Sequence, residues 1–524
     1  MNIYSQVLKR NMSKLLTLYN LDPASSTYGY GDRDVWGWRI KDFANGTHQG
    51  GVHALSIAIK LDLLAESEVG HQAIDAAIRA IPKIRAPNGS LAESYPFESS
   101  FCVTALVAFD CLSAISVLQD QLPQSLFDEY LTHIEPLVSF ITENDEKHGV
   151  ISNHLATAVA AVFRWNRLTG SSLSRGANLL RVILDNQSSE GWFKEYEAAD
   201  PGYQTLCTYY LAEAYSEAPS DELRLSLVKS AEFLKHFVHP DNTIGGLYGS
   251  RNTEVYYPAG VVQLSSLVPD FALIANRLER GVEDGHQILP ENIDMGNYIP
   301  LLNAYAVAAL HYKNSAPDIA SAAAPIPCEE ILEKDFTETG IFLKSTPSYF
   351  AVVNYKKGGV LKVFDKETKQ LATEDGGWHG RLNNGKRFAT QQFTAEASFS
   401  DHEARASFYR VNEAYPTPID FVMVRSLSQT LFRSLFLGNL FKKFLVWFLM
   451  TSKTRIPGSV LRQFEFGERT ITVTDSVVPP PDTKKIERPG KFRAIHMPSS
   501  GYFMPQSPHY NAPRKIVNFE LAGS

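Results

Sequence analysis

Residues 88–110, NGSLAESYPFESSFCVTALVAFD, resemble residues 190–214, EGWFKEYEAADPGYQTLCTYYLAEA. In both stretches a loop rich in glycine and acidic residues leads into an apolar helical run. The matching positions are Gly89 and Gly191, Glu93 and Glu195, Glu98 and Asp200, and Phe101 and Tyr203. Residues 242–262, NTIGGLYGSRNTEVYYPAGVV, form a weaker third copy. Helical hairpins that repeat with long loops at one end predict a closed or nearly closed ring, the α/α toroid.

Helical periodicity dominates the chain from about residue 48 to residue 313. We expect helices to begin near His48, Ser99, Leu126, Asn153, Ser172, Tyr203, Asp221, Pro258 and Asn297. The next segment, 314–335, is rich in Ala and Pro and is typical of a linker.

Beyond the linker the apolar residues no longer follow the helical period. The runs SYFAVVNY (348–355), GVLKVFD (359–365), EARASFYRV (403–411), FVMVRSL (421–427) and RTITVTDSV (469–477) are short, β-branched or aromatic, and separated by turns. Such runs predict the strands of an antiparallel β-sandwich over 336–524. The expected fold class is therefore a multidomain α and β protein. An incomplete α/α toroid over 1–313 is followed by the linker and the β-sandwich.

The composition limits the kinds of molecule that the protein can be expected to bind. The chain has 524 residues, a net charge of −7 and 44% hydrophobic residues, which is ordinary for a globular protein with a large core. The mild acidity argues against nucleic acid as the main partner. The four cysteines lie mostly in apolar runs and read as buried free thiols. No Cys/His cluster suggests a metal, no cofactor is expected, and the N-terminus lacks the apolar core of a signal peptide, so a cytoplasmic location is expected.

A basic hydrophobic segment, about 426–458, interrupts the strand pattern of the β-domain. No acidic residue lies between Asp420 and Glu465. Lys442 and Lys443 break the apolar run, and two lysines at the middle of a bilayer would cost several kcal/mol. We expect an interfacial helix or hairpin in peripheral contact with an anionic membrane on its inner face. The alternative is a helix packed on the core of the protein itself.

Three residues at expected helix starts have the chemistry to process a uronic acid. Removing the C5 proton of a uronate requires that the adjacent carboxylate be neutralised, and it requires a base and an acid. Asn153 can donate an amide hydrogen bond to that carboxylate, and His154 can donate when protonated or accept a proton when neutral. Tyr203 can act as an acid, or as a base if its pKa is lowered. The alternative roles are a helix cap for Asn153 and core packing for Tyr203.

The motifs SNH (152–154) and DPGYQ (200–204), together with the expected toroid and sandwich, resemble the heparinase II/III-like and alginate-lyase-like polysaccharide lyases and dermatan sulfate epimerase. The resemblance implies that Asn153 and His154 engage the uronate carboxylate and that Tyr203 transfers protons. It also implies a histidine from the β-domain, for which His379 is the candidate. His379 is followed by Gly380 and Arg381, so it lacks the Asp that the family commonly places two residues on.

Other loop residues are candidates for substrate binding. Arg251, with its neighbours Tyr248 and Asn252, suits a substrate carboxylate, although an arginine that braces the loops explains it equally well. Trp36 and Trp38 can stack on sugar faces or pack an N-terminal segment against the toroid. The acids at the repeated positions, Glu93 with Glu98 and Glu195 with Asp200, can pair for glycoside hydrolysis or cap the next helix; Glu93 and Glu195 are retained as candidates for substrate binding.

Three functions follow from these observations. The first is a polysaccharide uronate-processing enzyme that abstracts the C5 proton, either a lyase acting by β-elimination or a uronyl C5-epimerase, in glycan biosynthesis or modification. Its partner would be an acidic poly- or oligosaccharide. The second is an α/α-toroid glycoside hydrolase that uses the paired acids. The third is a non-catalytic glycan-binding or assembly protein.

Overall fold

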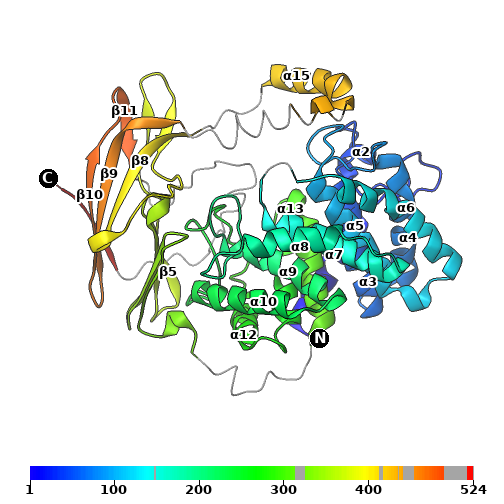
Figure 1. Cartoon of the computed structure of the whole chain (residues 1–524), viewed down its shortest axis with the longest axis horizontal. Helices are drawn as coiled ribbons and strands as arrows, with labels where there is room; N and C mark the ends of the chain where they lie inside the picture. The colour runs from blue at the N-terminus through cyan, green and yellow to red at the C-terminus, as the bar shows by residue number, and fades with distance from the viewer. Residues whose placement is uncertain are drawn as a thin grey trace.

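The computed structural model describes residues 1–146, 149–312, 325–411, 417–434, 436–438, 440, 454–488 and 516–522. A helical part and a β part lie side by side, and the chain passes from the first to the second after residue 312 (Figure 1). The expected fold class, an α/α toroid followed by a β-sandwich, is confirmed.

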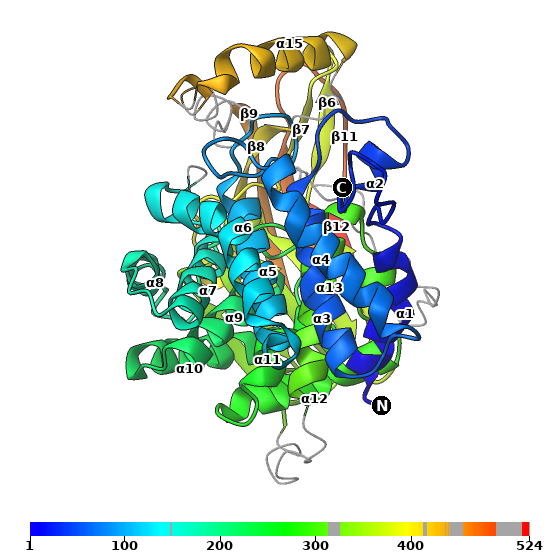
Figure 2. The same ribbon diagram turned by 90° about the vertical axis from the view of Figure 1, so that its right-hand side faces the viewer.

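The helices form two concentric layers (Figure 2). The inner layer contains α3 (Val52–Lys60), α5 (Phe101–Val117), α7 (Ser152–Thr169), α9 (Pro201–Glu217), α11 (Pro258–Gln263) and α13 (Met295–His311). The outer layer contains α1 (Ile3–Leu16), α4 (Ser67–Ile84), α6 (Gln124–Glu143), α8 (Arg175–Asp185), α10 (Asp221–Leu234) and α12 (Pro269–Glu283). Each inner helix contacts the next, and α13 contacts α3, so the inner layer forms a ring.

The two layers follow from the pattern of apolar residues. The inner helix α5 is buried at nearly every position because neighbours pack on all its sides, and α9 is buried along most of its length for the same reason. The outer helices α4 and α8 are amphipathic and bury one stripe each. Pro201 and Pro258 stand in the first turn of α9 and α11, where a proline costs no hydrogen bond.

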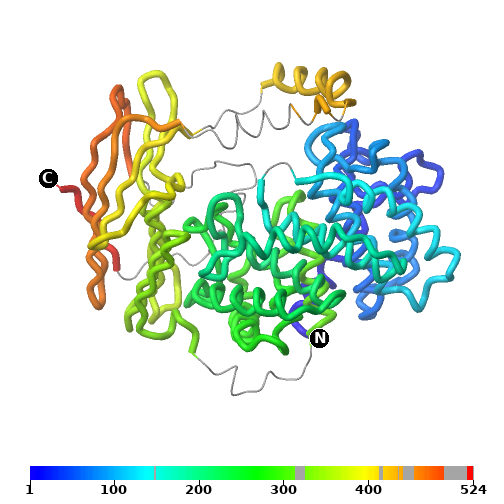
Figure 3. Tube along the Cα trace, viewed as in Figure 1, coloured from blue at the N-terminus to red at the C-terminus, as the bar shows by residue number. Residues whose placement is uncertain are grey.

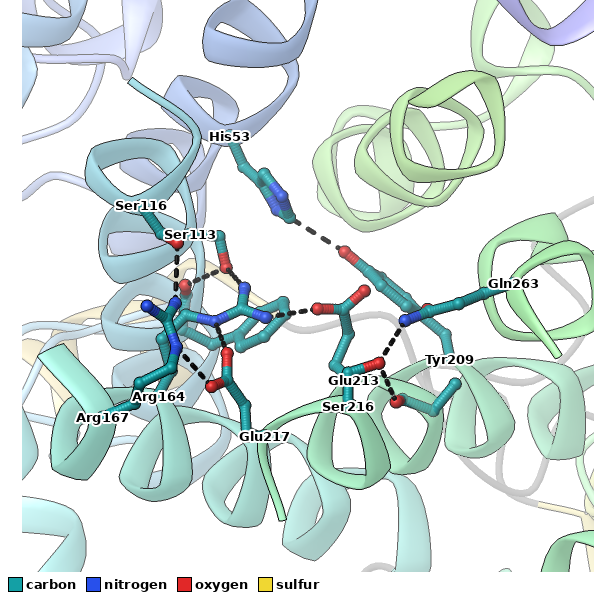
Figure 4. Close-up of polar contacts among 12 residues, drawn as sticks. His53, Ser113, Ser116, Arg164, Arg167, Tyr209, Glu213, Ser216, Glu217 and Gln263 are labelled. Atoms are coloured by element: carbon teal, nitrogen blue, oxygen red, sulfur yellow. Dashed lines mark hydrogen bonds and ion pairs between the residues drawn. The ribbon is translucent and has the colours of Figure 1, made fainter. Parts of the chain in front are cut away.

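The C-terminal ends of the inner helices are joined by buried charges (Figure 4). Arg164 near the end of α7 contacts Glu213 and Glu217 of α9, at 2.5 and 2.7 Å, and donates to Ser113 of α5. Arg167 makes a second contact with Glu217. A buried ion pair is strongly destabilised when one partner is removed, so this cluster ties three inner helices together at one end of the ring.

The β part contains two sheets. The five-stranded sheet has the order β1-β2-β3-β4-β5, with β1 (Leu332–Phe336), β2 (Ile341–Ser345), β3 (Tyr349–Asn354), β4 (Val360–Asp365) and β5 (Gln370–Asp375). The seven-stranded sheet has the order β11-β6-β7-β8-β9-β10-β12, with β6 (His379–Leu382), β7 (Arg387–Ala389), β8 (Glu403–Val411), β9 (Arg455–Phe466), β10 (Ile471–Val478), β11 (Thr483–Glu487) and β12 (Val517–Leu521). Neighbouring strands are antiparallel except β10 and β12, which are parallel.

The central strands of the five-stranded sheet, β3 and β4, are buried on both faces. Along β3, Tyr349, Ala351 and Val353 pack against the seven-stranded sheet, whereas Phe350 and Val352 join the core of the toroid. Successive side chains of a strand point to opposite faces, so one strand supplies two cores. This sheet is therefore the middle layer between the helices and the outer sheet.

The run FVMVRSL, expected as a strand, is part of helix α15 (Pro418–Gln429) instead. Thr417 and Asp420 form a capping box around Pro418, and this start signal outweighs the β-branched residues that follow. The helices α1, α4 and α12 were not expected. Much of the predicted interfacial segment, 441–453, lies outside the described residues. No helix among the described ranges is long and apolar enough to cross a membrane.

Candidate active site

One end of the ring gathers all the loops that precede the inner helices. Inner and outer helices alternate along the chain, so the inner helices run in the same direction and their N-termini share one end. The candidates Asn153, His154 and Tyr203 stand in the first turns of α7 and α9. The ring therefore brings loops that are far apart in sequence to one rim.

The loops before α5 and α9 contain the same turn. Ala86 donates its backbone N–H to Ser90 at 2.8 Å, and Ser188 donates to Trp192 at 3.0 Å. Gly89 and Gly191 occupy the same place in the two turns, with φ of +87° and +99°. A Cβ atom at Gly89 would lie 2.1 Å from the carbonyl oxygen of Pro136, and one at Gly191 would lie 2.2 Å from that of Lys229. Only glycine fits at either position, which explains the match in sequence.

A buried cluster forms around the carboxylate of Glu195. The amide of Asn153 donates to Oε2 of Glu195 at 2.8 Å, and Nη1 of Arg251 lies 2.6 Å from Oε1. The guanidinium of Arg251 stacks on the ring of Tyr203, 3.7 Å from its centroid, and lies 5.4 Å from that of Tyr196. These contacts bring together Asn153, Tyr203 and Arg251, three of the residues singled out from the sequence.

Backbone contacts place Glu195 at the start of α7. Ile151 and Glu195 form an antiparallel bridge, and Ser152 donates its backbone N–H to the carbonyl of Lys194 at 3.1 Å. The next residue, Tyr196, has a φ of +62°, a conformation that non-glycine residues seldom adopt. The loop before α9 is thus fixed against the first turn of α7.

Asp200 connects the loop before α9 to the loop before α11. One of its carboxylate oxygens caps α9 by accepting from the backbone N–H of Tyr203 at 3.0 Å. The other accepts from the backbone N–H of Arg251 at 2.8 Å. Asp200 therefore positions Tyr203 and Arg251 together, which is the helix-capping role that the sequence left as an alternative.

The middle sheet braces the loop that holds Arg251. Nζ of Lys357 donates to the carbonyls of Leu247 and Gly249 and to the side chain of Asn252. Asn354 of β3 donates to the carbonyl of Tyr248 at 2.8 Å. Asn252 and Tyr248, both candidates for substrate binding, thus contact the β part and are buried.

His154 is held by a carboxylate. Its Nδ1 lies 2.9 Å from Oε2 of Glu146. Burial alone would lower the pKa of His154, but the contacts with Cys102 and Glu146 hold that pKa well above its ordinary value. The raised pKa favours the protonated imidazole, a form that can donate hydrogen bonds.

Burial also shifts the other groups of the cluster. It raises the pKa of Tyr203 well above its ordinary value, and the nearby guanidinium of Arg251 opposes this shift. It raises the pKa of Glu195 as well, again against Arg251. Tyr203 keeps 8% of its surface exposed and the side chain of His154 keeps 17%. The pKa of Tyr203 stays raised in the presence of Arg251, so the phenol is the favoured form and Arg251 only lessens the effect of burial.

The remaining candidates lie elsewhere on the rim or in the β part. Trp36 donates its indole N–H to the carbonyl of Leu18 at 2.8 Å, which anchors the N-terminal loop, while Trp38 is 68% exposed. The backbone N–H of Glu93 donates to the carboxylate of Glu98, so Glu98 holds its own loop.

His379 begins β6 in the outer sheet. Its Nε2 lies 3.6 Å from Oε1 of Glu487 on the neighbouring strand β11. Burial lowers its pKa from the ordinary value. His379 therefore lies beside a carboxylate of its own sheet, and the lowered pKa favours the neutral imidazole.

Sequence reasoning missed Glu146, the partner of His154, and Lys357, the brace of the Arg251 loop. Neither stands in a recognisable motif, and both act through contacts that only the fold creates. Among the described residues no group of three His, Cys, Asp or Glu side chains is arranged to hold a metal ion.

No protein-family model matches the chain, and no curated protein is found to be similar to it. Solved structures are similar at low identity. Xanthan lyase of Paenibacillus is 8% identical, with 78% of this chain and 44% of that chain covered and a TM-score of 0.47. Heparinase III is 12% identical, with 71% and 59% covered and a TM-score of 0.44. Chondroitin AC lyase of Streptomyces coelicolor A3, in complex with chondroitin sulphate, is 11% identical, with 78% and 65% covered and a TM-score of 0.47.

The chain thus spans 44% to 65% of the length of these lyases.

Proposed function

We propose that this chain abstracts the C5 proton of a uronic acid in an acidic poly- or oligosaccharide, as a lyase or as a uronyl C5-epimerase. One observation carries the proposal: Asn153, Arg251 and Tyr203 meet around a single buried carboxylate at the rim where the inner helices begin. The hydrogen-bond donors and the proton carrier that this reaction needs are thus gathered in one place.

The first task of the site is to neutralise the substrate carboxylate as the enolate forms. Glu195 orients the Asn153 amide through one N–H, and the second N–H of that amide can donate to the substrate. His154, protonated through Glu146, supplies a positive charge beside it. Donors fixed before the reaction begins cost no reorganisation in the transition state.

The second task is to move the proton. Burial favours the phenol, so Tyr203 first gives its hydroxyl proton to solvent; as the phenolate it then takes the C5 hydrogen and becomes the phenol again. In a lyase the phenol then protonates the departing C4 oxygen, and a double bond forms between C4 and C5. In an epimerase the enolate is instead reprotonated at C5 from the opposite face. Arg251 stabilises the phenolate because its guanidinium lies over the ring.

Glu195 also limits which substrates enter. Its carboxylate already accepts from Asn153 and Arg251, the groups expected to bind the substrate carboxylate. A uronate must therefore share these donors with Glu195, which disfavours a substrate with several charges at this subsite.

The test is incubation with uronate-containing glycans in deuterated water. A lyase produces an unsaturated uronate that absorbs in the near ultraviolet. An epimerase incorporates deuterium at C5 without that absorbance. New reducing ends with neither signal would identify a glycoside hydrolase, and the absence of all three across uronate glycans would contradict the proposal.

The cellular setting belongs to the same proposal. We place the reaction in glycan biosynthesis or modification, in the cytoplasm and at the inner face of a membrane. Cell fractionation with a tagged full-length chain tests the location.

A further inference from the structure

Helix α15 exposes the residues that a helix normally buries. Ile419, Phe421, Val422 and Met423 are 52% to 78% exposed, whereas the one fully buried residue of the helix is Ser428. Further along, Phe436 is 76% exposed. Contiguous exposed apolar surface marks a site of interaction with a protein or a membrane. We call the described part of residues 417–440 the strap.

Three contacts attach the strap to the toroid. Arg425 forms an ion pair with Asp42 at 2.6 Å. Phe432 is buried, with its ring 5.5 Å from that of Tyr95. Arg433 lies over the ring of Phe97 at 5.5 Å. The apolar side chains therefore face outward while the strap is held in place.

These contacts put the strap at the rim. Asp42 lies in the loop before α3, and Tyr95 and Phe97 lie in the loop before α5. In Figures 1 and 3 helix α15 lies beside the N-terminal, blue part of the toroid. The middle sheet braces the loop before α11, so the strap and the sheet contact different loops of the same rim.

The neighbouring loop enlarges the apolar surface. Trp38 is 68% exposed and Ile40 is 73% exposed, and both precede Asp42 by a few residues. The apolar surface thus comes from two segments that the Arg425–Asp42 pair joins.

The charges of this region indicate the partner. From Phe421 to Phe464 the sequence has no acidic residue, and its basic residues include Arg425, Arg433, Lys442 and Lys443. Arg39, Lys41, Arg425 and Arg433 outnumber Asp42 and Asp420 around the exposed apolar side chains, and such an excess of cations suits the headgroup region of an anionic bilayer. We propose that the strap and residues 38–40 dock the protein on an anionic phospholipid membrane, with the rim of the ring close to the lipid surface.

Sedimentation with vesicles tests this docking. The full chain is mixed with vesicles of phosphatidylcholine alone, or of phosphatidylcholine with phosphatidylglycerol. We expect binding to the anionic vesicles, which weakens as salt is raised, and at least about tenfold weaker binding to the neutral ones. The double variant Phe421→Ser, Val422→Ser should lose about tenfold or more of the binding to anionic vesicles.

The matched control is Leu225→Ser with Leu267→Ser, two exposed apolar residues outside the strap, which should bind as the unchanged chain does. Circular dichroism checks that both variants fold. Absence of binding to anionic vesicles, equal binding to neutral ones, or equal binding by both double variants would overturn the proposal. A dimer that forms without lipid and that the Phe421→Ser, Val422→Ser variant does not form would also overturn the proposal, because a second copy would then occupy this surface. Light scattering detects such a dimer. No glycan is present, so the result is independent of the proposed catalysis.

Discussion

The loops before α5 and α9 have the same backbone turn but different side-chain chemistry. Each has the same turn, and each has a glycine pressed against a carbonyl of the following outer helix. The first loop ends at Phe101, whereas the second ends at Tyr203, whose ring carries the guanidinium of Arg251. The comparison teaches that the repeat supplies a scaffold, and that a few side chains on one copy make it a candidate site.

The largest expected effect comes from giving the second loop the phenylalanine that the first loop has at the matching position. Tyr203→Phe removes the hydroxyl that carries the proton, so activity should fall by about 10²–10⁴-fold. The unfolding free energy should change by at most about 1 kcal/mol, because the ring and its stacking on Arg251 remain. Activity assays and thermal unfolding of one preparation measure both. Activity close to that of the unchanged chain would return Tyr203 to a packing role, as for Phe101.

A smaller loss is expected when the arginine over the ring is changed. Arg251→Lys keeps the charge for Glu195 but removes the planar stack, so activity should drop by about 10–100-fold. The matched control is Arg164→Lys at the opposite end of the ring, where the arginine also holds buried carboxylates. That variant should lower stability without a comparable change in activity per folded molecule. Equal effects of the two variants on activity would argue that Arg251 is structural.

The shared turn predicts equal costs in stability. Gly89→Ala and Gly191→Ala should each destabilise the protein by about 2–3 kcal/mol, because the new Cβ meets a carbonyl oxygen and φ is positive. Gly170→Ala isolates the conformational strain, since its φ is +72° and nothing lies within 4 Å of its Cβ. It should cost about 1 kcal/mol. Denaturant unfolding ranks the three, and a Gly191 cost no larger than that of Gly170 would contradict the common turn.

The smallest effect is a shift along the pH axis. Glu146→Gln removes a cause of the raised pKa of His154, so activity that needs the imidazolium should fall at lower pH than in the unchanged chain. The contact between His154 and Glu146 also contributes to the free energy of unfolding. That contribution is fully present below about pH 6.5, the ordinary pKa of histidine, and is lost as the pH rises through the raised pKa of the folded state. A pH–rate profile and unfolding at several pH values check it. An unshifted alkaline limb would exclude His154 as the titrating group.

The repeat made much of the ring predictable. Glycines and acids at a constant offset identified the hairpins, and the expected starts near Asn153, Tyr203 and Pro258 lie within two residues of the observed ones. The outer helices α4 and α12 were not expected, although each has an apolar stripe like that of α8, which was expected. The helix at Pro418 was read as a strand because β-branched residues outweighed its capping box.

The site was predictable only in part. Side chains at helix starts suggested Asn153, His154 and Tyr203, and their chemistry suggested a role. That Glu195 joins Asn153 to Arg251 was not visible, because the contact links loops that only the closed ring brings together. The raised pKa of His154 depends in part on Glu146, which no motif marks.

The burial of β3 on both faces has a consequence for how the protein unfolds. Phe350 and Val352 belong to the toroid's core, and Tyr349 and Ala351 belong to the sandwich's core, all within one strand. Cutting the chain between the helices and the strands would expose one apolar face of β3 to water. The two halves should therefore melt in a single cooperative step, and a helical fragment expressed alone should aggregate.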